Sequence, residues 1–361
     1  SHLESQADEL SKYFSLIWVP PSGNCNTLKN QMGYAPIWWF KHDSAFGSEQ
    51  QLRKMIKTFK EKGTGIIEDV VINHRNGNTN WCDFPPETWN GQTFTWSLAD
   101  ICKGDDQGET EQNGYALKGN SDTGDDFKGA RDIDHTSANA QKNIKAYLDF
   151  LLNDLGYTGF RYDMVKGFAA NYIGMYNTSA KPVYSVGEYW DKTGNIKNWI
   201  NGTKVDDVPT SAAFDFDLKY RIFEAFSSNG DWSKLNGECL VKDSYYKQYA
   251  VTFVDNHDTG RTDGHGSSPL FANIEAANAY ILAMPGTPCV FLPHWLQYKT
   301  AIKRMIATRR AVGISNTSDI LQSDAKNDGF VLKVKGSQGD LLLILGTTTD
   351  ANTQGMKLAT S

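Results

Sequence analysis

The stretch Thr158-Gly-Phe-Arg161-Tyr-Asp163 is a short apolar run that ends in charged side chains, and it predicts a buried β-strand. The segment before it, residues 138–155, places Ile144, Leu148 and Leu151 at helical spacing on one face. A strand that directly follows a helix, with further strand-like runs on both sides, is typical of a parallel sheet covered by helices.

The same alternation of strands and helices continues along most of the chain. We expect strands at residues 14–19, 65–72, 158–162, 183–186, 211–216, 248–254 and 289–291. We expect helices at residues 4–12, 49–62, 138–155, 273–284 and 298–311, with one more that ends at residue 226. So many strand–helix steps in one run favour a closed TIM (β/α) barrel over the rival doubly wound sheet.

Two segments interrupt this alternation. Residues 75–131 are rich in Gly, Asn and Asp and show no periodicity, which predicts an inserted loop-rich domain. After Gly313 only short strands remain, at 330–335 and 341–345, and they predict a small C-terminal antiparallel β domain. The expected division is a catalytic barrel at 1–74 and 132–314, an inserted domain at 75–131 and a β domain at 315–361.

The composition of the chain excludes several classes of protein. A net charge of −6 over 361 residues gives no electrostatic footprint for nucleic acid. No apolar run approaches the roughly 20 residues of a membrane span, and no signal peptide is visible. The five cysteines form no CxxC pair, which argues against structural zinc; whether Cys82 and Cys102 form a disulfide stays open. The 10 Trp suit either a large core or a surface that stacks on sugar rings.

Polar and charged residues gather at the carboxyl ends of four of the expected strands. These strand ends are residues 69–74, 161–163, 187–188 and 255–258. In TIM barrels, side chains at these ends converge on the active site. A salt bridge at the barrel rim would explain one such cluster, but four together favour an active site rich in carboxylates.

These clusters resemble the conserved regions of the α-amylase family of glycoside hydrolases. They read Asp69-Val-Val-Ile-Asn73-His74, Gly159-Phe-Arg161-Tyr-Asp163-Met-Val-Lys166-Gly167, Gly187-Glu188-Tyr-Trp190 and Phe253-Val-Asp255-Asn256-His257-Asp258, with a fifth element, Asp132-Ile-Asp134-His135. Their details are most similar to plant α-amylases and their bacterial relatives, and the resemblance runs from about residue 13 to the C-terminus.

The resemblance implies three catalytic carboxylates, namely Asp163, Glu188 and Asp258. Glycosidic cleavage with retention needs a nucleophilic carboxylate and an acid/base carboxyl about 5 Å apart. Asp163 fits the nucleophile, and Arg161, two residues earlier on the same side of the strand, would keep it ionised. Glu188 fits the acid/base, a role that requires a raised pKa in the first step. Asp258 would hold the sugar hydroxyls and stabilise the transition state.

The resemblance also implies contacts to substrate and to a metal ion. The expected substrate-binding residues are Tyr34, His74, Arg161, Lys166, Trp190 and His257. Tyr34 would stack under the attacked sugar, whereas Lys166 and Trp190 would line the leaving-group side. A bound Ca²⁺, which prefers oxygen ligands, would be held by Asn73, Asp122, Asp132 and the carbonyl of Gly167. The alternatives are that Trp190 packs in the core, that His74 caps a strand and that the 122–126 segment is a solvated acidic turn.

The sequence departs from the family at its start, because a helix at 4–12 comes where a first barrel strand is expected. We therefore expect a barrel whose first strand is absent from this chain, with the insertion after the third barrel strand. The expected function is retaining endo-hydrolysis of α-1,4-glucosidic bonds in starch-like α-glucans. Transglycosylation, exo or α-1,6 cleavage and glucan binding without catalysis stay open. We expect a monomer that is secreted, periplasmic or at the cell surface, as its polymeric substrate suggests.

Overall fold

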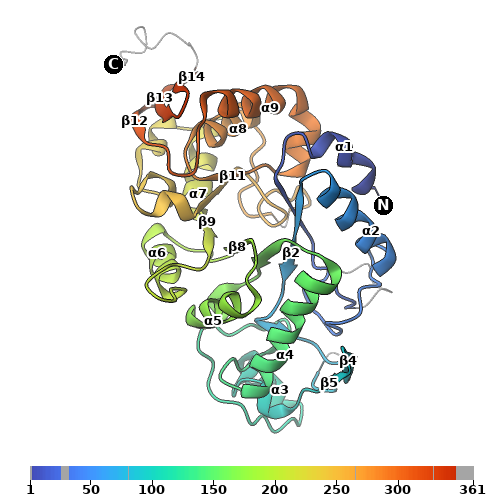
Figure 1. Cartoon of the computed structure of the whole chain (residues 1–361). Coiled ribbons are helices and arrows are strands. Elements are labelled where there is room, and N and C mark those ends of the chain that lie inside the picture. The colour runs from blue at the N-terminus through green and yellow to red at the C-terminus, as the bar shows by residue number, and fades with distance from the viewer. Residues whose placement is uncertain (1, 26–31, 80, 265, 328, 347–361) are drawn as a thin grey trace. The chain divides into compact units, whose positions relative to one another are not determined.

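The computed structural model describes residues 2–25, 32–79, 81–264, 266–327 and 329–346 (Figure 1). These residues divide into two units, one within positions 1–189 and 200–211 and the other within positions 190–199 and 212–346. The three-domain division expected from the sequence is a different partition, and its boundaries stay a prediction.

The first unit contains a sheet of four parallel strands in the order β1-β2-β7-β8. The strands are β1 (Leu16–Val19), β2 (Gly65–Val70), β7 (Gly159–Tyr162) and β8 (Tyr184–Gly187). The helices are α1 (Ala7–Leu10), α2 (Glu49–Glu61), α3 (Glu109–Gln112), α4 (Ala138–Asp149) and α5 (Asn171–Ala180), and α6 (Thr193–Gly202) contains residues of both units. Each parallel strand matches one expected from the sequence to within three residues at each end.

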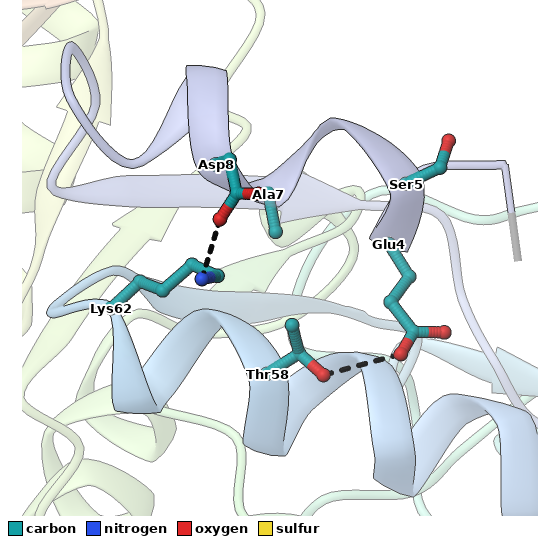
Figure 2. Close-up of a pocket in the computed structure, with 6 residues that line it drawn as sticks. All are labelled: Glu4, Ser5, Ala7, Asp8, Thr58 and Lys62. Atoms are coloured by element: carbon teal, nitrogen blue, oxygen red, sulfur yellow. Dashed lines mark hydrogen bonds and ion pairs between the residues drawn. The ribbon is translucent and has the colours of Figure 1, made fainter.

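Helix α2 shows why these segments fold as predicted. Its N-terminus is a capping box in which Ser48 and Gln51 satisfy each other's backbone N–H groups. Met55, Ile56 and Phe59 form its buried face. The N-terminal segment packs along this helix around a surface pocket, shown in Figure 2, where Lys62 pairs with Asp8. The pocket is lined by Glu4, Ser5, Ala7, Asp8, Thr58 and Lys62.

The segment 75–131 has more regular structure than the sequence indicated. A hairpin joins β4 (Glu87–Trp89) to β5 (Gln92–Phe94) through Asn90-Gly91, whose positive φ angles of 48° and 72° suit a tight hairpin turn. The two-residue strands β3 (His74–Arg75) and β6 (Arg131–Asp132) pair antiparallel and tie the start of the insertion to its end. The sequence showed no periodicity here because these short elements depend on pairing with other segments more than on a local pattern.

The second unit contains three parallel strands, β9 (Ala212–Phe214), β10 (Ala250–Phe253) and β11 (Thr287–Cys289). Its helices are α7 (Phe216–Phe226), α8 (Ile274–Ala283) and α9 (Leu292–Val312). An antiparallel sheet of β12 (Ile320–Lys326), β13 (Gly329–Gly336) and β14 (Gly339–Gly346) follows, as expected for the C-terminal region.

One strand of the second unit lies earlier than predicted. Strand β11 ends at Cys289, and Phe291 already serves as the N-cap of α9, so the expected strand at 289–291 was wrong. Pro288 lies inside the true strand, and because proline is disfavoured in sheets it obscured the pattern. None of the helices within the described ranges has the length and apolarity that crossing a bilayer requires.

A carboxyl group is buried behind the sheet of the first unit. Glu68 of β2 is fully buried and accepts hydrogen bonds of 2.8 Å from both the backbone N–H and the hydroxyl of Ser22. The Ser22 hydroxyl also contacts His42 and accepts a hydrogen bond from Tyr157. Burial raises the pKa of Glu68 to about 8, because the surrounding hydrogen bonds offset only part of the cost of a buried charge.

This raised pKa predicts that the first unit loses stability as the pH rises. Between the ordinary glutamate pKa of about 4.5 and the folded value of about 8, the folded protein binds more protons than the unfolded chain, so the free energy of unfolding falls with increasing pH. Glu68→Gln should reduce that fall by on the order of 1 kcal/mol or more between pH 5 and pH 8. Urea titrations at several pH values measure it, with Glu61→Gln on α2 as control. An unchanged pH dependence would contradict the prediction.

Candidate active site

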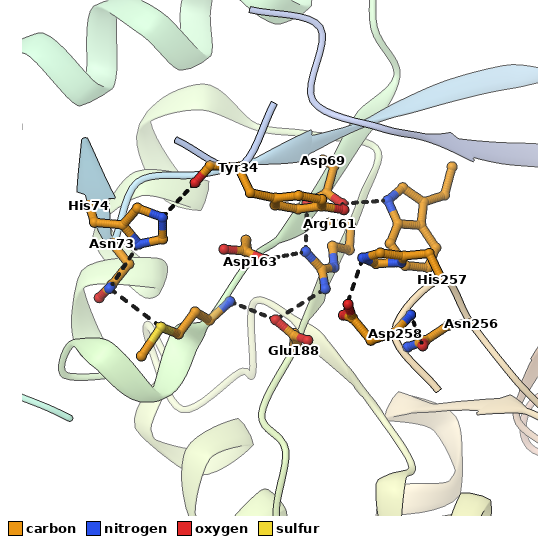
Figure 3. A network of polar contacts seen from close by, with 12 residues as sticks. Tyr34, Asp69, Asn73, His74, Arg161, Asp163, Glu188, Asn256, His257 and Asp258 are labelled. Carbon is orange, nitrogen blue, oxygen red and sulfur yellow. Dashed lines mark hydrogen bonds and ion pairs between the residues drawn. The ribbon is translucent and has the colours of Figure 1, made fainter. Parts of the chain in front are cut away.

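A single guanidinium group gathers three carboxylates at the strand ends of the first unit (Figure 3). Nη1 of Arg161 lies 2.7 Å from Asp69 Oδ1 and 2.7 Å from Asp163 Oδ1, and Nη2 lies 3.1 Å from Glu188 Oε2. These residues lie on or directly after β2, β7 and β8. Burial alone would lower the pKa of Arg161, but the three negative charges outweigh it and raise that pKa well above its usual value.

Both carboxylate oxygens of Asp69 accept hydrogen bonds. Its Oδ2 accepts hydrogen bonds from Trp18 Nε1 at 3.1 Å and from the Tyr34 hydroxyl at 2.7 Å, and its Oδ1 is bound by Arg161. Burial raises the pKa of Asp69 to about 6. The sequence motif contains Asp69 but indicates no role for it, and no motif contains Trp18. Both residues lie near the carboxyl ends of neighbouring strands, and that position was the available signal.

Asp163 and Glu188, the expected nucleophile and acid/base, lie close together. They bind the two terminal nitrogens of one guanidinium, and their side chains are 12% and 10% exposed, so both reach solvent. Glu188 Oε2 also accepts a 2.8 Å hydrogen bond from the backbone N–H of Met164, which has a left-handed backbone with φ 42°. A pair of neighbouring, solvent-reaching carboxylates is the arrangement that retaining glycoside cleavage needs.

His74 is buried and held by the protein at both ring nitrogens. Nε2 lies 2.7 Å from the carbonyl oxygen of Tyr34, and Nδ1 lies 3.2 Å from Asn73 Nδ2. Its ring stacks on Phe127 with 4.0 Å between the centroids. Burial lowers the pKa of His74 to about 4, so its imidazole is neutral at physiological pH. Its contact with sugar stays a prediction.

The remaining expected substrate residues belong to both units. In the first unit, Lys166 lies 5.5 Å above the ring of Tyr189 and 3.9 Å from a carboxylate oxygen of Asp125. In the second unit, Trp190 stacks on Phe216. Also there, His257 Nε2 lies 3.2 Å from Asp258 Oδ2, and the Asp258 side chain is 41% exposed. The roles of Trp190, His257 and Asp258 stay predictions.

The expected metal ligands of the first unit lie next to one another. Asn73 Nδ2 is 3.1 Å from Asp132 Oδ1, and Gly167 is so close to Asn73 that a Cβ on it would lie 1.8 Å from Asn73 Oδ1. Asp122 Oδ2 is buried and has no hydrogen-bond partner. Burial raises the pKa of Asp132 to about 9, with the charges of Asp122 and Asp105 adding to the effect. An unsatisfied buried oxygen in an oxygen-rich, anionic cluster fits a hard cation.

A second group of carboxylates shares Asp132 with this set. Ligand atoms of Asp105, Asp126 and Asp132 all lie within 4.8 Å of one another, so this group could hold a metal ion. Asp105 lies in no motif of the sequence, and Asp126 was expected only in a solvated acidic turn. Cys82 and Cys102 lie outside both groups and do not form a disulfide.

Comparison with known proteins identifies the family. The sequence model described as the alpha amylase catalytic domain matches residues 14–294. The chain belongs to the α-amylase family of glycoside hydrolases. Over 342 residues it is 32% identical to Probable alpha-amylase 2 of Arabidopsis thaliana, covering 88% of this chain and 78% of that protein. It is also 32% identical to a glucan 1,4-alpha-maltotetraohydrolase of Stutzerimonas stutzeri, covering 92% of this chain but 62% of that protein.

Solved structures show the fold of this α-amylase family member. The crystal structure of CldA, a cyclomaltodextrin glucanotransferase, superposes with a TM-score of 0.72 at 16% identity, covering 95% of this chain and 78% of that one. The predicted fold class is therefore confirmed. In the part of the chain described, it is an incomplete TIM barrel with seven parallel strands, small inserted sheets and a C-terminal antiparallel sheet.

The position of Arg161 predicts that lysine cannot replace it. A lysine ammonium is a point charge that does not reproduce the planar fork binding Asp69, Asp163 and Glu188 together. Arg161→Lys should therefore destabilise the protein by about 3 kcal/mol, because it leaves buried carboxylates poorly compensated. Thermal melting measures the effect, with Arg53→Lys on the exposed pair with Glu49 as control. Equal melting temperatures for the two variants would argue against the central role of Arg161.

Proposed function

We propose that this chain cleaves internal α-1,4-glucosidic bonds of starch-like α-glucans with net retention at the anomeric carbon. The observation that carries the proposal is the pairing of Asp163 and Glu188 with opposite nitrogens of Arg161 in a chain of this family. The names of its relatives support an α-glucan substrate, since they denote an amylase, a glucan 1,4-alpha-maltotetraohydrolase and a cyclomaltodextrin glucanotransferase.

The proposed reaction has two displacements. Asp163 attacks the anomeric carbon while Glu188 donates its proton to the leaving glycosidic oxygen, which forms a glycosyl–enzyme ester and releases one end of the glucan. Glu188 then accepts a proton from water, the water oxygen attacks the anomeric carbon, and Asp163 leaves as a carboxylate. The ion pair with Arg161 and the hydrogen bond from the Met164 N–H fix the position of Glu188 Oε2. Asp258 would hold the sugar hydroxyls.

We infer that the cation of this enzyme is Ca²⁺. The residues that would hold it are Asn73, Asp122, Asp132 and the carbonyl of Gly167, and the unpartnered Asp122 Oδ2 supports this set. Ca²⁺ accepts six to eight oxygen ligands and tolerates irregular geometry, which suits side chains drawn from three separate segments. Bound there, it would supply a link between the inserted segment and the strand ends. We also propose that the protein acts as a monomer outside the cytoplasm, where polymeric glucan is encountered.

The proposed reaction predicts that a single carboxylate change abolishes activity. Asp163→Asn removes the nucleophile but keeps the shape of the side chain, so release of reducing ends from soluble starch should fall roughly 10³-fold or more. Asp149→Asn, on the exposed face of α4, is the matched control and should behave as the parent. Full activity in Asp163→Asn would exclude double displacement at this residue, and an inactive parent would favour a glucan-binding protein.

The products of the same digestion separate endo action from its rivals. An endo enzyme should release long linear fragments from amylose early in the reaction. A single small product from the first time point would favour exo action, an outcome that the name of the maltotetraohydrolase relative makes worth measuring. Cyclic or lengthened chains would indicate transglycosylation, and cleavage of pullulan would indicate α-1,6 specificity.

The proposed Ca²⁺ site predicts that stability depends on the ion. Chelation should lower the melting temperature and added Ca²⁺ should restore it, because a ligand that binds only the folded state stabilises that state. Asp122→Ala should abolish this response, whereas Asp125→Ala, which changes a neighbouring exposed carboxylate, should retain it. A Ca²⁺ response that survives in Asp122→Ala would exclude Asp122 as a ligand.

A further inference from the structure

Tyr220 of helix α7 connects Trp190, which is expected on the leaving-group side, to the segment that carries Asp258. We propose that Tyr220 is a positioning residue that fixes Trp190, on the expected leaving-group side, to the segment that carries Asp258, and so determines which bond of a glucan is cleaved. The inference rests on the proposed function for the role of Asp258, and on the family resemblance for the place of Trp190. The contacts themselves all lie within the second unit.

The connection is a series of three hydrogen bonds. Trp190 Nε1 donates to the Tyr220 hydroxyl at 2.8 Å, and that hydroxyl lies 3.0 Å from Ser267 Oγ. The backbone N–H of Ser267 donates to the carbonyl oxygen of Asp258 at 3.2 Å. Because the indole N–H can only donate, the Tyr220 oxygen must accept from it, and the Tyr220 proton is then available to Ser267.

Helix α7 fixes Trp190 at two points. Phe216 and Tyr220 are four residues apart on the helix and therefore lie on one face. The Trp190 ring stacks on the fully buried Phe216, with 4.7 Å between centroids and 17° between planes. Stacking sets the plane of the indole, and the hydrogen bond to Tyr220 sets its rotation within that plane. Without the Tyr220 hydroxyl, the indole could rotate more freely within its plane.

The neighbouring Lys219 anchors the same segment without using Tyr220. Its buried ammonium pairs with Asp255 at 2.8 Å and donates to the carbonyl oxygen of Ser268 at 2.7 Å. Helix α7 therefore holds two consecutive residues of the segment, Ser267 and Ser268. Because Lys219 keeps the backbone in place, loss of the Tyr220 hydroxyl should leave the fold intact and act on the orientation of Trp190 and Ser267.

The consequence is an effect on specificity rather than on bond chemistry. The Tyr220 hydroxyl bonds Trp190 and Ser267, neither of which is expected to form or break a bond in the reaction, so the two displacements should continue without it. A change in the orientation of Trp190 would alter how sugars on the leaving-group side bind. That change should appear in which bond of an oligosaccharide is cut and in KM, more than in kcat.

The experiment compares Tyr220→Phe, Trp190→Phe and the double variant on maltoheptaose labelled at its reducing end. Each single change removes one partner of the same hydrogen bond and keeps an aromatic ring. We expect each to change the ratio of the two main cleavage products by roughly 2- to 10-fold, the range for one neutral hydrogen bond. The double variant should show no larger change than the greater single effect, because both changes break the hydrogen bond between Trp190 and Tyr220. Tyr280→Phe is the control, since its buried hydroxyl has no hydrogen-bond partner.

Several outcomes would overturn the inference. A product ratio in Tyr220→Phe equal to that of the parent would do so, as would effects of the two single variants that multiply in the double variant. If Tyr220→Phe melts far below the parent, Ser267→Ala breaks the series from its other end and must shift the product ratio in the same way.

If the parent cleaves no maltoheptaose, the proposed function fails, and calorimetric titration with maltoheptaose decides instead. Equal affinity of Tyr220→Phe and parent then overturns the inference, and weaker affinity supports it.

Discussion

The candidate site depends on the burial of one positive charge among three negative ones. Arg161 is fully buried and is shared by Asp69, Asp163 and Glu188. Burying a charge is costly unless it is paired and hydrogen-bonded, so the guanidinium and the carboxylates each require the other. Parallel strands make this possible, because their carboxyl ends bring side chains from distant parts of the sequence to one edge of the sheet.

One guanidinium cannot neutralise three carboxylates, and the three carboxylates differ in how the remaining charge is stabilised. Asp69 takes neutral donors from Trp18 and Tyr34 and is fully enclosed, which suits a group that orients Arg161. Asp163 and Glu188 keep part of their surface toward solvent, which suits groups that must meet a substrate. The different exposure of similar carboxylates thus separates a supporting residue from the two that are expected to react.

The sequence predicted the elements whose signal is local and missed those that depend on long-range contacts. Buried parallel strands read as apolar runs, and α2 has an apolar stripe, so both could be predicted. Helices α5 and α6 were missed because both contain Gly and Asn, which have low helix propensity, although α6 carries Ile196, Trp199 and Ile200 as a buried stripe. The motifs named Asp163 and Glu188, which both bind Arg161 in the structure. They could not show the Met164 N–H, because its donation to Glu188 depends on a left-handed backbone that a non-glycine residue rarely adopts.

The strand pair of β3 and β6 links the expected metal ligands to an expected substrate-binding residue. In the register of β3 with β6, His74 lies opposite Asp132, so an expected sugar ligand and an expected metal ligand share one pair of backbones. Asp132 Oδ2 also accepts a hydrogen bond from the N–H of Phe127, whose ring stacks on His74. A proton or cation that neutralises Asp132 would therefore affect Asn73 and Phe127, which both contact Asp132 and His74. The acidic cluster thus borders the His74 imidazole, which stays uncharged near neutral pH because its pKa is lowered to about 4.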